Sequence, residues 1–494
     1  MSIPPYCILC TARSGSTALA RILDQAENGH CAVEPAPNFN YETRLAMDGR
    51  LDAVARTNLI QSTLVPRVHE SQELYEIYGE KHVTYGPFIA EISQELKARF
   101  IHLIRDGREV VRSMIDWHNA KFGTIYRECT DAGTLSSEAI SAAANLLACN
   151  DLSDYSRCRP SPMDDVYTRW SEFSRAQMCS WYWVRTHEIY LDALSRLPED
   201  QWRRVDLKKH EQIHDLFPFL SLSSPPESAL TKMLGSRINS LEDRQTPNTD
   251  PYPSWEFWDS DTRDAFEELA GSMMTRLGYW ESHATRWRPV QFGQVWQDKG
   301  GDLDWYEWMY NGRRQVHEDL LHWIQEHPEI RSCVDLGCGL GVGYRETFSD
   351  RRYMGVDLST TNIEWCNNNN DNPLHSYVAE DFMVSNPDEL FDLAYSQGTI
   401  DNCYDMDEYL GAVARWSKGW IYATCYRGWF PNLQEHQYTW NPDHSCFYND
   451  LSPTRARKTL EDIGCTNIEI TPVPTGNDDI PYETRIVARV PVKS

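Results

Sequence analysis

The sequence predicts an α/β protein with two domains, each a parallel sheet between two layers of helices. Two separate regions begin with an apolar strand, a loop of small residues and an amphipathic helix, and this order opens domains with parallel sheets. The chain has 494 residues, whereas one hydrophobic core rarely grows past about 250–300 residues. We expect a first domain over residues 1–281 and a second over 302–494. Residues 282–301 lack apolar periodicity and end in two glycines, so we expect a linker there.

The composition and net charge disfavour some classes of binding partner. Hydrophobic residues make up 41% and charged residues 24%, which is typical of a globular protein. The net charge of −26 disfavours nucleic acid and anionic membranes as partners, because like charges repel. No apolar run is long enough for a transmembrane helix, and the start of the chain lacks a basic leader, so we expect a cytoplasmic protein. Most of the 14 cysteines are then expected to be reduced core residues. For Cys7 and Cys10 we favour two core thiols over the alternative of a redox or metal pair.

The first loop, Thr11–Thr17, follows a strand at Tyr6–Cys10 and opens a helix at Ala18–Gln25. Backbone N–H groups at a helix N-terminus favour an anion. Further donors are supplied by the side chains of Arg13, Ser14, Ser16 and Thr17, with Gly15 between them. The loop lacks the lysine of nucleotide-hydrolysing phosphate loops, which argues against ATP hydrolysis. An ordinary turn with a helix cap is the alternative interpretation.

A second anion site is predicted after the buried strand Phe100–Ile104. Arg105 leaves the carboxyl end of that strand, where ligands bind in open parallel sheets. Ser113 lies about two helical turns further on. The two side chains can hold a second phosphate, although Arg105 and Asp106 can also be an ion pair that caps the helix.

Together, RSGST after the first strand and RDGREVVRS after FIHLI resemble the sulfotransferase family. The resemblance covers about residues 1–281 and implies a fold like that of the phosphate-loop proteins. It implies that Arg13–Thr17 bind the 5′-phosphosulfate end of 3′-phosphoadenosine 5′-phosphosulfate (PAPS), and that Arg105 and Ser113 bind the 3′-phosphate. The RSGST form is closer to the bacterial carbohydrate and protein-tyrosine types than to the cytosolic phenol type.

Sulfuryl transfer requires a base for the acceptor hydroxyl and cations for the transferred oxygens. Glu34 lies 21 residues after Arg13, at a similar place to the catalytic glutamate of the tyrosyl and trehalose-type relatives, so we expect it to be the base. Lys81 resembles a lysine that polarises the sulfuryl group, and His82 is the rival base. A surface role is the alternative for Glu34 and for His82. Arg237 resembles part of the late loop that closes over the nucleotide. The unassigned stretch between Trp117 and Trp170 is expected to cover the acceptor site.

The second region, SCVDLGCGLGVGY, begins with a buried strand that ends near Asp335 and runs into a glycine-rich loop with Gly337 and Gly339. Glycines let the backbone approach a ligand closely. The next strand ends at Asp357, 22 residues after Asp335, where a carboxylate can accept hydrogen bonds from a ribose diol. Three further residues follow later strands: an acid and an aromatic suited to adenine, Asp381 and Phe382, and Ser396.

This order, VDLGCGLG, VDLS, EDF and FDLAYSQG, resembles the class I S-adenosylmethionine-dependent methyltransferases over roughly residues 302–494. The resemblance implies a Rossmann-like fold, with Asp335, Gly337 and Gly339 at the methionine part, Asp357 at the ribose, and Asp381 with Phe382 at the adenine. A dinucleotide reductase is the competing interpretation, but its GxGxxG pattern differs from the Gly337-Cys338-Gly339-Leu340-Gly341 loop found here.

The methyl acceptor site is less clearly marked. His436 and His444 are each candidate bases for methyl transfer. Asp401, Asp405 and Asp407 suggest a metal, as in catechol-type enzymes, but we favour a solvated acidic helix start and expect no metal.

These observations predict a bifunctional tailoring enzyme. It would transfer a sulfuryl group from PAPS and a methyl group from S-adenosylmethionine to a small-molecule acceptor such as a phenol, sugar or secondary metabolite, at oxygen. One alternative is a single-activity enzyme whose other domain is a binding or regulatory module. Another is a module that senses either cofactor without turnover. The sequence leaves the oligomeric state open.

Overall fold

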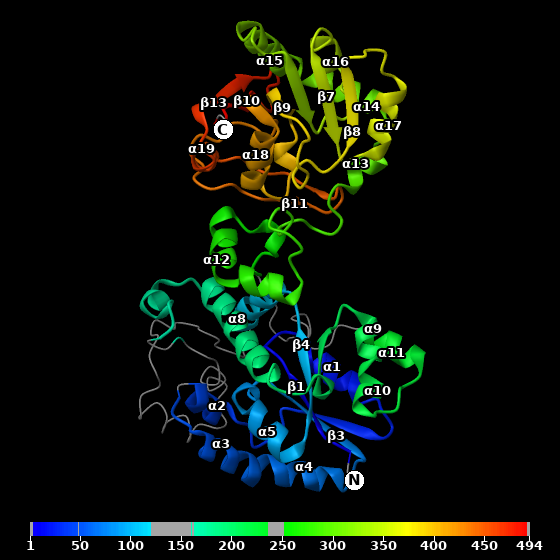
Figure 1. The fold of residues 1–494 in the computed structure, drawn as a ribbon, viewed down its shortest axis with the longest axis vertical. Coiled ribbons are helices and arrows are strands. Elements are labelled where there is room, and N and C mark those ends of the chain that lie inside the picture. The colour runs from blue at the N-terminus through cyan, green and yellow to red at the C-terminus, as the bar shows by residue number, and fades with distance from the viewer. Residues whose placement is uncertain (1–2, 48, 120–159, 161–162, 236–250, 492–494) are drawn as a thin grey trace. The chain divides into compact units, whose positions relative to one another are not determined.

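The chain forms two compact units in a computed structural model that describes residues 3–47, 49–119, 160, 163–235 and 251–491 (Figure 1). Unit 1 comprises Met1–Trp255 and Asp264–Tyr279, and unit 2 comprises Glu256–Arg263 and Trp280–Ser494. The range 282–301, expected as a linker, lies in unit 2 and contains the helix α13 (Gln294–Asp298). Trp287 from this range is buried at 2% exposure, and it contacts Trp258 and Trp280 edge-on.

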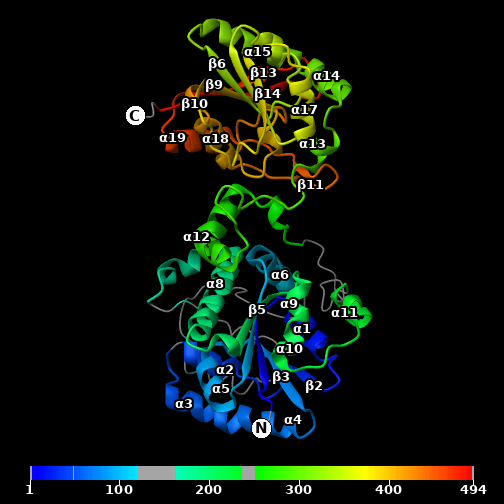
Figure 2. The ribbon, with the colours of Figure 1, turned by 45° about the vertical axis from the view of Figure 1, so that its right-hand side comes forward.

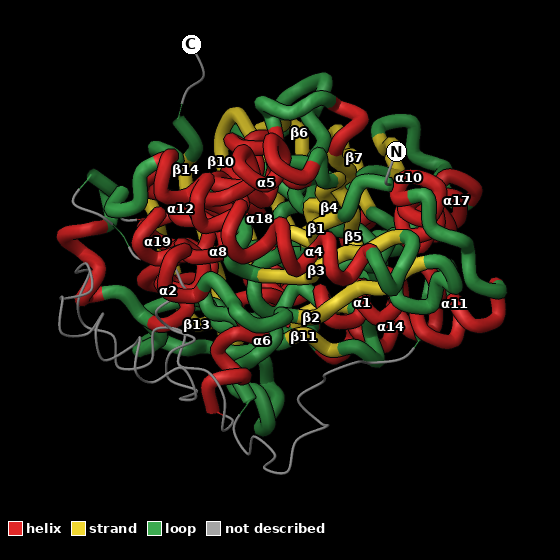
Figure 3. Tube along the Cα trace, turned by 90° about the horizontal axis from the view of Figure 1, so that it is seen from below, coloured by secondary structure: helices red, strands yellow, loops and turns green. Residues whose placement is uncertain are grey.

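Unit 1 is built on a five-stranded parallel sheet with the order β2-β3-β1-β4-β5. Figure 3 shows these strands side by side. Their bounds are β1 (Tyr6–Leu9), β2 (Gly29–Val33), β3 (Ile77–His82), β4 (Arg99–Ile104) and β5 (Trp202–Asp206). The strand predicted over Phe100–Ile104 is confirmed by β4. A continuous apolar run of this length fits a strand that is buried on both faces.

Alternate side chains of β1 enter the two hydrophobic cores on opposite faces of this sheet. Tyr6 and Ile8, with Cys10 just after the strand, belong to one core, whereas Cys7 and Leu9 belong to the core on the other face. This follows from the two-residue period of a strand. Cys7 and Cys10 are therefore separate core thiols, and the other cysteines in the described part of the chain are also buried and free of disulfides.

The helices of unit 1 cover both faces of its sheet, with α5 and α8 on one side of β1 and β4 and α1, α9 and α10 on the other (Figure 1). Ser174 and Gln177 form a capping box that starts the long α8. The helices are α1 (Ser16–Leu23), α2 (Asn40–Met47), α3 (Ala53–Leu59), the π-helical η1 (Ile60–Leu64), α4 (Val65–Gln72), α5 (Ile89–Leu96), α6 (Gly107–Asn119), α8 (Arg175–Leu194), α9 (His210–His214), α10 (Leu216–Leu220), α11 (Glu227–Leu234) and α12 (Ser260–Leu277), whose first residues belong to unit 2.

Unit 2 is built on a seven-stranded sheet with the order β13-β14-β10-β9-β6-β7-β8. Its strands are β6 (Ser332–Leu336), β7 (Arg352–Asp357), β8 (His375–Ala379), β9 (Phe391–Gln397), β10 (Ser417–Cys425), β13 (Thr466–Pro474) and β14 (Tyr482–Arg489), and a separate two-stranded ribbon is formed by β11 (Trp440–Asn441) and β12 (Cys446–Phe447).

The sheet of unit 2 is mixed, which corrects the expectation of a purely parallel sheet. Strands β6 to β10 pair in parallel, but β14 pairs antiparallel with β10 and β13. The segment between β13 and β14 is too short for the crossover of a dozen or more residues that parallel neighbours require.

Helices cover both faces of this sheet as well. Figure 2 shows α18 and α19 on the opposite side from α14 and α17. Helices α15 and α17 share one core with β6, β7, β9 and β10. Apart from α13, the helices are α14 (Leu303–Gly312), α15 (Arg314–Glu326), α16 (Tyr344–Thr347), α17 (Thr360–Asn368), α18 (Met406–Arg415) and α19 (Pro453–Asp462).

In each large sheet, the chain first adds strands on one side of its first strand and then on the other side. The candidate motifs lie at this reversal. In unit 2, the chain runs from β6 outward through β7 to β8, and then returns to the other side of β6 to form β9 and β10. In unit 1, β1 lies between β3 and β4. Open α/β sheets bind ligands at the carboxyl ends of the strands beside such a reversal. Among the described residues, no helix is both long and apolar enough to span a membrane.

Candidate functional sites

The loop after β1 has the backbone of a strained turn. Arg13 has a φ of 65° and Gly15 a φ of 88°. A Cβ on Gly15 would lie 2.5 Å from Leu207 Cδ1, which explains the glycine. A non-glycine residue with positive φ is uncommon, and such residues cluster at functional sites. Ser14 stabilises the turn by donating from Oγ to the Thr11 carbonyl, at 2.9 Å.

The two predicted anion motifs of unit 1 meet in space. Arg105 donates from Nη1 to the Arg13 carbonyl at 2.9 Å, and Arg13 donates from Nε to Ser113 Oγ at 3.0 Å. These contacts join residues about a hundred positions apart, so only the fold brings them together. The alternative of an Arg105–Asp106 ion pair is wrong, because Asp106 pairs with Arg108 at 2.7 Å and Arg105 with Glu109 at 2.9 Å.

Glu34 and Lys81 form an ion pair between Oε1 and Nζ at the carboxyl ends of β2 and β3. The Lys81 side chain is buried, whereas the Glu34 side chain is 46% exposed. Glu34 has a φ of 47°, and its N–H donates to the Lys81 carbonyl at 2.9 Å. An exposed carboxylate held beside a buried ammonium combines a proton acceptor with a cation.

His82 lies in the core of unit 1, so the alternative of a surface histidine is wrong. It is 1% exposed, its Nδ1 lies 2.6 Å from Thr84 Oγ1, and its ring stacks on Tyr85. Arg237 and most of the stretch expected to cover the acceptor site lie outside the described residues.

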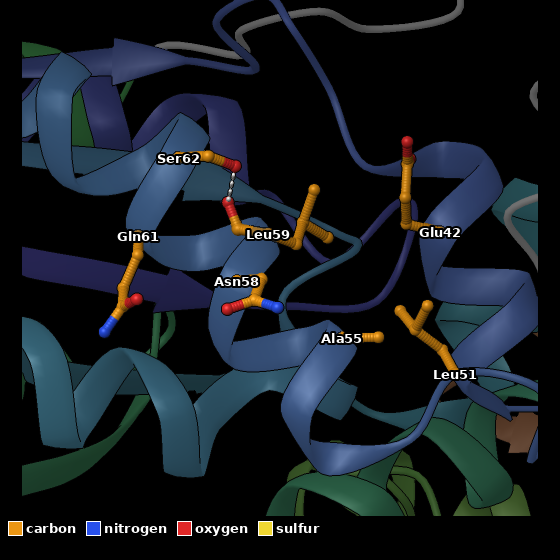
Figure 4. Close-up of a pocket in the computed structure, with 7 residues that line it drawn as sticks. All are labelled: Glu42, Leu51, Ala55, Asn58, Leu59, Gln61 and Ser62. Atoms are coloured by element: carbon orange, nitrogen blue, oxygen red, sulfur yellow. Dashed lines mark hydrogen bonds between the residues drawn. The ribbon is translucent and has the colours of Figure 1, made fainter.

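A pocket of about 530 Å³ lies elsewhere in unit 1 (Figure 4). It is lined by Glu42 of α2, by Leu51 ahead of α3, by Ala55, Asn58 and Leu59 of α3, and by Gln61 and Ser62 of η1. Burial raises the pKa of Glu42 above its usual value. None of the predicted site residues lines this pocket.

In unit 2, the glycine-rich loop after β6 is fastened to the end of β7. Gly337 donates its N–H to the Val356 carbonyl, and Gly339 donates to Asp357 Oδ2, both at 2.8 Å. Gly337 and Gly339 have φ values of 82° and 53°. The loop is thereby held open at the reversal of strand order, with its backbone in conformations that favour glycine.

The carboxylate of Asp357 accepts most of its hydrogen bonds from donors within the protein. Its Oδ2 accepts from Gly339, and its Oδ1 accepts from the Ser359 N–H at 2.8 Å and from Asn362 Nδ2 at 3.3 Å. A carboxylate can accept about four hydrogen bonds, so about one acceptor position of Asp357 is left. Both hydroxyls of a ribose diol would need two. Burial raises the pKa of Asp357 above its usual value.

Asp335 supports the loop from inside the sheet. Its Oδ2 accepts from the hydroxyls of Tyr353 at 2.9 Å and Tyr395 at 2.8 Å, and the residue is 3% exposed. Burial raises its pKa to about 7, although both tyrosine hydroxyls act in the opposite direction. Ser396 is similarly buried, and its Oγ contacts the Leu336 carbonyl and the Tyr409 hydroxyl.

Asp381 and Phe382 lie after β8, at the same edge of the sheet. Asp381 accepts from the Met383 N–H at 3.0 Å and from Arg288 Nη1 at 3.2 Å. Burial raises the pKa of Asp381 above its usual value. The Phe382 ring is buried edge-on against Tyr409.

The two candidate bases for methyl transfer lie in different environments. His436 is fully buried, accepts at Nδ1 from the Ser452 N–H, and has Nε2 3.6 Å from Asp407 Oδ1. Burial alone would raise the pKa of Asp407, but His436, Thr459 and Arg455 together lower it below its usual value. His444 is exposed and contacts the Tyr448 hydroxyl.

The three aspartates after β9 do not form a solvated helix start, so that expectation is wrong. Asp401 is 0% exposed and accepts from the N–H groups of Tyr426 and Arg427, and burial raises its pKa to about 7. Asp405 is also buried, caps α18 and pairs with Arg286. Among the described residues, no cluster of metal-ligating side chains is found.

Sequence reasoning assigned no role at this site to the residues of α14. Tyr306, Tyr310 and Arg313 follow one face of α14 and the residue after it. A Cβ built on Gly339 would lie 2.4 Å from the Tyr306 ring, and one on Gly343 would lie 2.1 Å from the Tyr310 ring. The spacing of four and three residues is the signal that could have found this face.

One comparison with known proteins falls within this second unit. The methyltransferase-domain family matches residues 334–422. Ribosomal RNA large subunit methyltransferase G of Aliivibrio fischeri (strain MJ11) is 25% identical over 194 residues, covering 35% of this chain and 50% of that protein. The chain thus spans half the length of this curated relative.

Two solved structures illustrate the similarity. The N-methyltransferase NodS of Bradyrhizobium japonicum WM9, in complex with S-adenosylhomocysteine, shares 13% identity, with a TM-score of 0.32 over 41% of this chain and 100% of that one. The magnesium protoporphyrin IX methyltransferase ChlM of Synechocystis PCC 6803 shares 11% identity, with a TM-score of 0.31 over 40% and 99%. Residues 334–422, within unit 2 of this α/β protein, thus resemble the methyltransferase-domain family.

Proposed function

We propose that unit 2 transfers a methyl group from S-adenosylmethionine to a small-molecule acceptor, at oxygen. The observation that carries this proposal is the hydrogen bond between Gly339 N–H and Asp357, which holds a glycine loop open at the reversal of strand order. The match to the methyltransferase-domain family supports it.

The residues present fit this cofactor. The positive-φ glycines provide a loop whose backbone a ligand can approach, and Asp357 keeps one acceptor position for a ribose hydroxyl. We assign the adenine to Asp381 and Phe382, which follow β8 at the same edge of the sheet. S-adenosylmethionine supplies an electrophilic methyl group. The chain's own task is to orient it and to hold the acceptor, while Asp335 and Ser396 brace the sheet beneath the loop.

Calorimetric titration with S-adenosylhomocysteine tests this proposal. We expect one-site binding by the wild type, and a loss of about tenfold or more in Asp357→Asn, because the carboxylate that shapes the loop becomes a weaker acceptor. Asp350→Asn is the matched control, since Asp350 is exposed and pairs loosely with Arg351. No binding by the wild type would contradict the proposal.

We further propose that unit 1 transfers a sulfuryl group from PAPS to a hydroxyl, which would make the chain a bifunctional tailoring enzyme. The meeting of Arg13, Arg105 and Ser113 supports this second function, because two guanidinium groups and a hydroxyl suit a phosphate-rich ligand. The acceptor oxygen would form a bond to sulfur as the bond from sulfur to the phosphate oxygen breaks. Glu34 would take the acceptor's proton and Lys81 would stabilise the transferred oxygens.

Titration with 3′-phosphoadenosine 5′-phosphate, compared with adenosine 5′-phosphate, tests this second function. We expect the wild type to prefer the ligand that carries the 3′-phosphate, and Ser113→Ala and Arg105→Gln to lose that preference. Arg21→Gln, on the exposed face of α1, is the control. If the wild type binds neither ligand, unit 1 is not a PAPS enzyme and the chain has the methyltransferase activity alone.

A further inference from the structure

The pocket of unit 1 drawn in Figure 4 has an apolar floor that follows the helix α3. Ala55 and Leu59 lie four residues apart and share one face of this helix, and Leu51 precedes it. Leu51 and Leu59 also pack against a hydrophobic core of unit 1, which holds the floor in place. From Ala55 to Ser62 the chain rises by about 10 Å along α3 and η1. The floor can therefore hold a short aliphatic chain.

Two polar side chains on one side of this floor present hydrogen-bond acceptors. Ser62 Oγ donates to the Leu59 carbonyl at 3.4 Å, so the lone pairs of the hydroxyl oxygen remain for a ligand. Gln61 Nε2 donates to Glu95 Oε2 at 2.9 Å, which fixes the amide and leaves its oxygen for a ligand. Figure 4 shows this oxygen on the side of Asn58 and the amide nitrogen farther away. A ligand group that donates hydrogen bonds suits this side of the pocket.

Glu42 lies on the other side of the floor and is the one charged residue among the described residues that line the pocket (Figure 4). Its carboxyl group forms a hydrogen bond with its own backbone. Burial raises its pKa above the usual value, because the carboxylate has lost part of its hydration. Arg56, on the same helix as the floor, is already paired with Glu91 at 2.7 Å. A cation from outside the protein would replace the hydration that Glu42 has lost.

We propose that this pocket binds a small organic ammonium ion that carries a second hydrogen-bond donor, with the ammonium group at Glu42 and the aliphatic body along the floor. The second donor, a hydroxyl or another amine, would bind the oxygens of Gln61 and Ser62. An ammonium group has three donors and no acceptor, so it suits a pocket that offers acceptors and a negative charge. The net charge of −26 favours the approach of a cation. None of the residues assigned to the two transfer reactions lines this pocket, so the inference goes beyond both.

Three ligands of similar length that differ at one end test the proposal. They are 6-aminohexan-1-ol, hexane-1,6-diol and 6-hydroxyhexanoate, which place an ammonium group, a hydroxyl or a carboxylate at the Glu42 end. Their dissociation constants are obtained by saturation-transfer NMR titrations on the full chain. A charge-assisted hydrogen bond predicts that the wild type binds the amino alcohol more tightly than the diol by about tenfold. We expect no binding of the hydroxy acid, because two carboxylates repel each other.

Glu42→Gln keeps the size of the side chain and removes its charge. We expect the preference for the amino alcohol over the diol to fall to within about threefold of one in this variant, with the diol still bound. Ala55→Leu, which fills the floor, is expected to weaken the binding of both ligands by about tenfold or more. Glu70→Gln is the matched control, since Glu70 is exposed on α4 and does not line the pocket.

An unchanged preference in Glu42→Gln would overturn the proposal, because the ammonium group would then bind elsewhere on this acidic protein. Full binding of both ligands by Ala55→Leu would also overturn it, since the floor would not be their site. A wild type that binds none of the three ligands, or that binds the hydroxy acid as tightly as the amino alcohol, would overturn it as well. The two transfer reactions are tested separately, by titration with their own nucleotides.

Discussion

At the residue scale, two buried histidines of unit 1 illustrate how packing sets protonation. His102 of β4 and His187 of α8 share a hydrogen bond of 2.8 Å between Nε2 and Nδ1, and both rings are fully buried. Burial lowers the pKa of His102, and it lowers that of His187 to about 3, with Arg204 acting in the same direction. The pair is therefore neutral in the folded protein at neutral pH.

This pair predicts that unit 1 loses stability in acid. An unfolded histidine binds a proton below a pH of about 6.5, whereas folded His187 does so only near pH 3. Its contribution is therefore fully present above pH 6.5 and is lost as the pH falls from there toward 3. Each such histidine contributes a slope of up to about 1.4 kcal/mol per pH unit in that window. Urea unfolding at pH 7 and pH 5 measures the loss.

Replacement of one histidine separates this effect from the titration of carboxylates. We expect His187→Gln to show a smaller loss between pH 7 and pH 5 than the wild type, by about 1–2 kcal/mol. His69→Gln, at an exposed position on α4, is the control and should keep the full pH dependence. An unchanged pH dependence in His187→Gln would contradict the argument.

At the scale of elements, glycines in unit 2 serve different purposes. Gly343 precedes α16 with a φ of 75°, and a Cβ there would lie 2.1 Å from the ring of Tyr310 on α14. Gly411 lies inside α18, and a Cβ there would have no atom within 4 Å. The first glycine is needed for the contact between a loop and a helix, whereas the second leaves a helix less stable than alanine would.

Alanine substitutions at the two positions are therefore expected to change the free energy of unfolding in opposite directions. Gly411→Ala should raise the free energy of unfolding by about 0.5–1 kcal/mol, because it reduces the freedom of the unfolded chain. Gly343→Ala should lower it by about 1–2 kcal/mol, because an L side chain is strained at positive φ and also displaces Tyr310. Thermal unfolding of the two variants beside the wild type checks both signs, and a stabilising Gly343→Ala would contradict the close packing of Tyr310 on Gly343.

At the scale of the whole molecule, the described residues form two large sheets, each with its own buried core or cores. We therefore expect two thermal transitions in calorimetry. S-adenosylhomocysteine at about 100 times its dissociation constant should stabilise one of them by about 2.7 kcal/mol and leave the other in place. A single transition that shifts as a whole would show instead that the units unfold together.

Much of the strand framework was predictable from local patterns. The strand expected at Phe100–Ile104 is observed at Arg99–Ile104, and the strands expected to lead to Asp357 and Ser396 end at Asp357 and Gln397. Their apolar runs end in Arg105, Asp357 and Ser396, and polar residues at strand ends are typical of ligand-binding edges. The antiparallel β14 was not predicted, because an isolated strand pattern does not reveal the direction of its partner.

The order of strands and loops was thus determined by the sequence, because apolar periodicity and glycine positions act over a few neighbouring residues. The tertiary structure alone decided which of these residues meet. Arg13 reaches Ser113, Arg313 reaches Glu483, and Asp401 becomes buried, through contacts between residues that are distant along the chain. Burial and hydrogen bonding depend on such contacts, so the roles of charged residues could be assigned only after the fold was known.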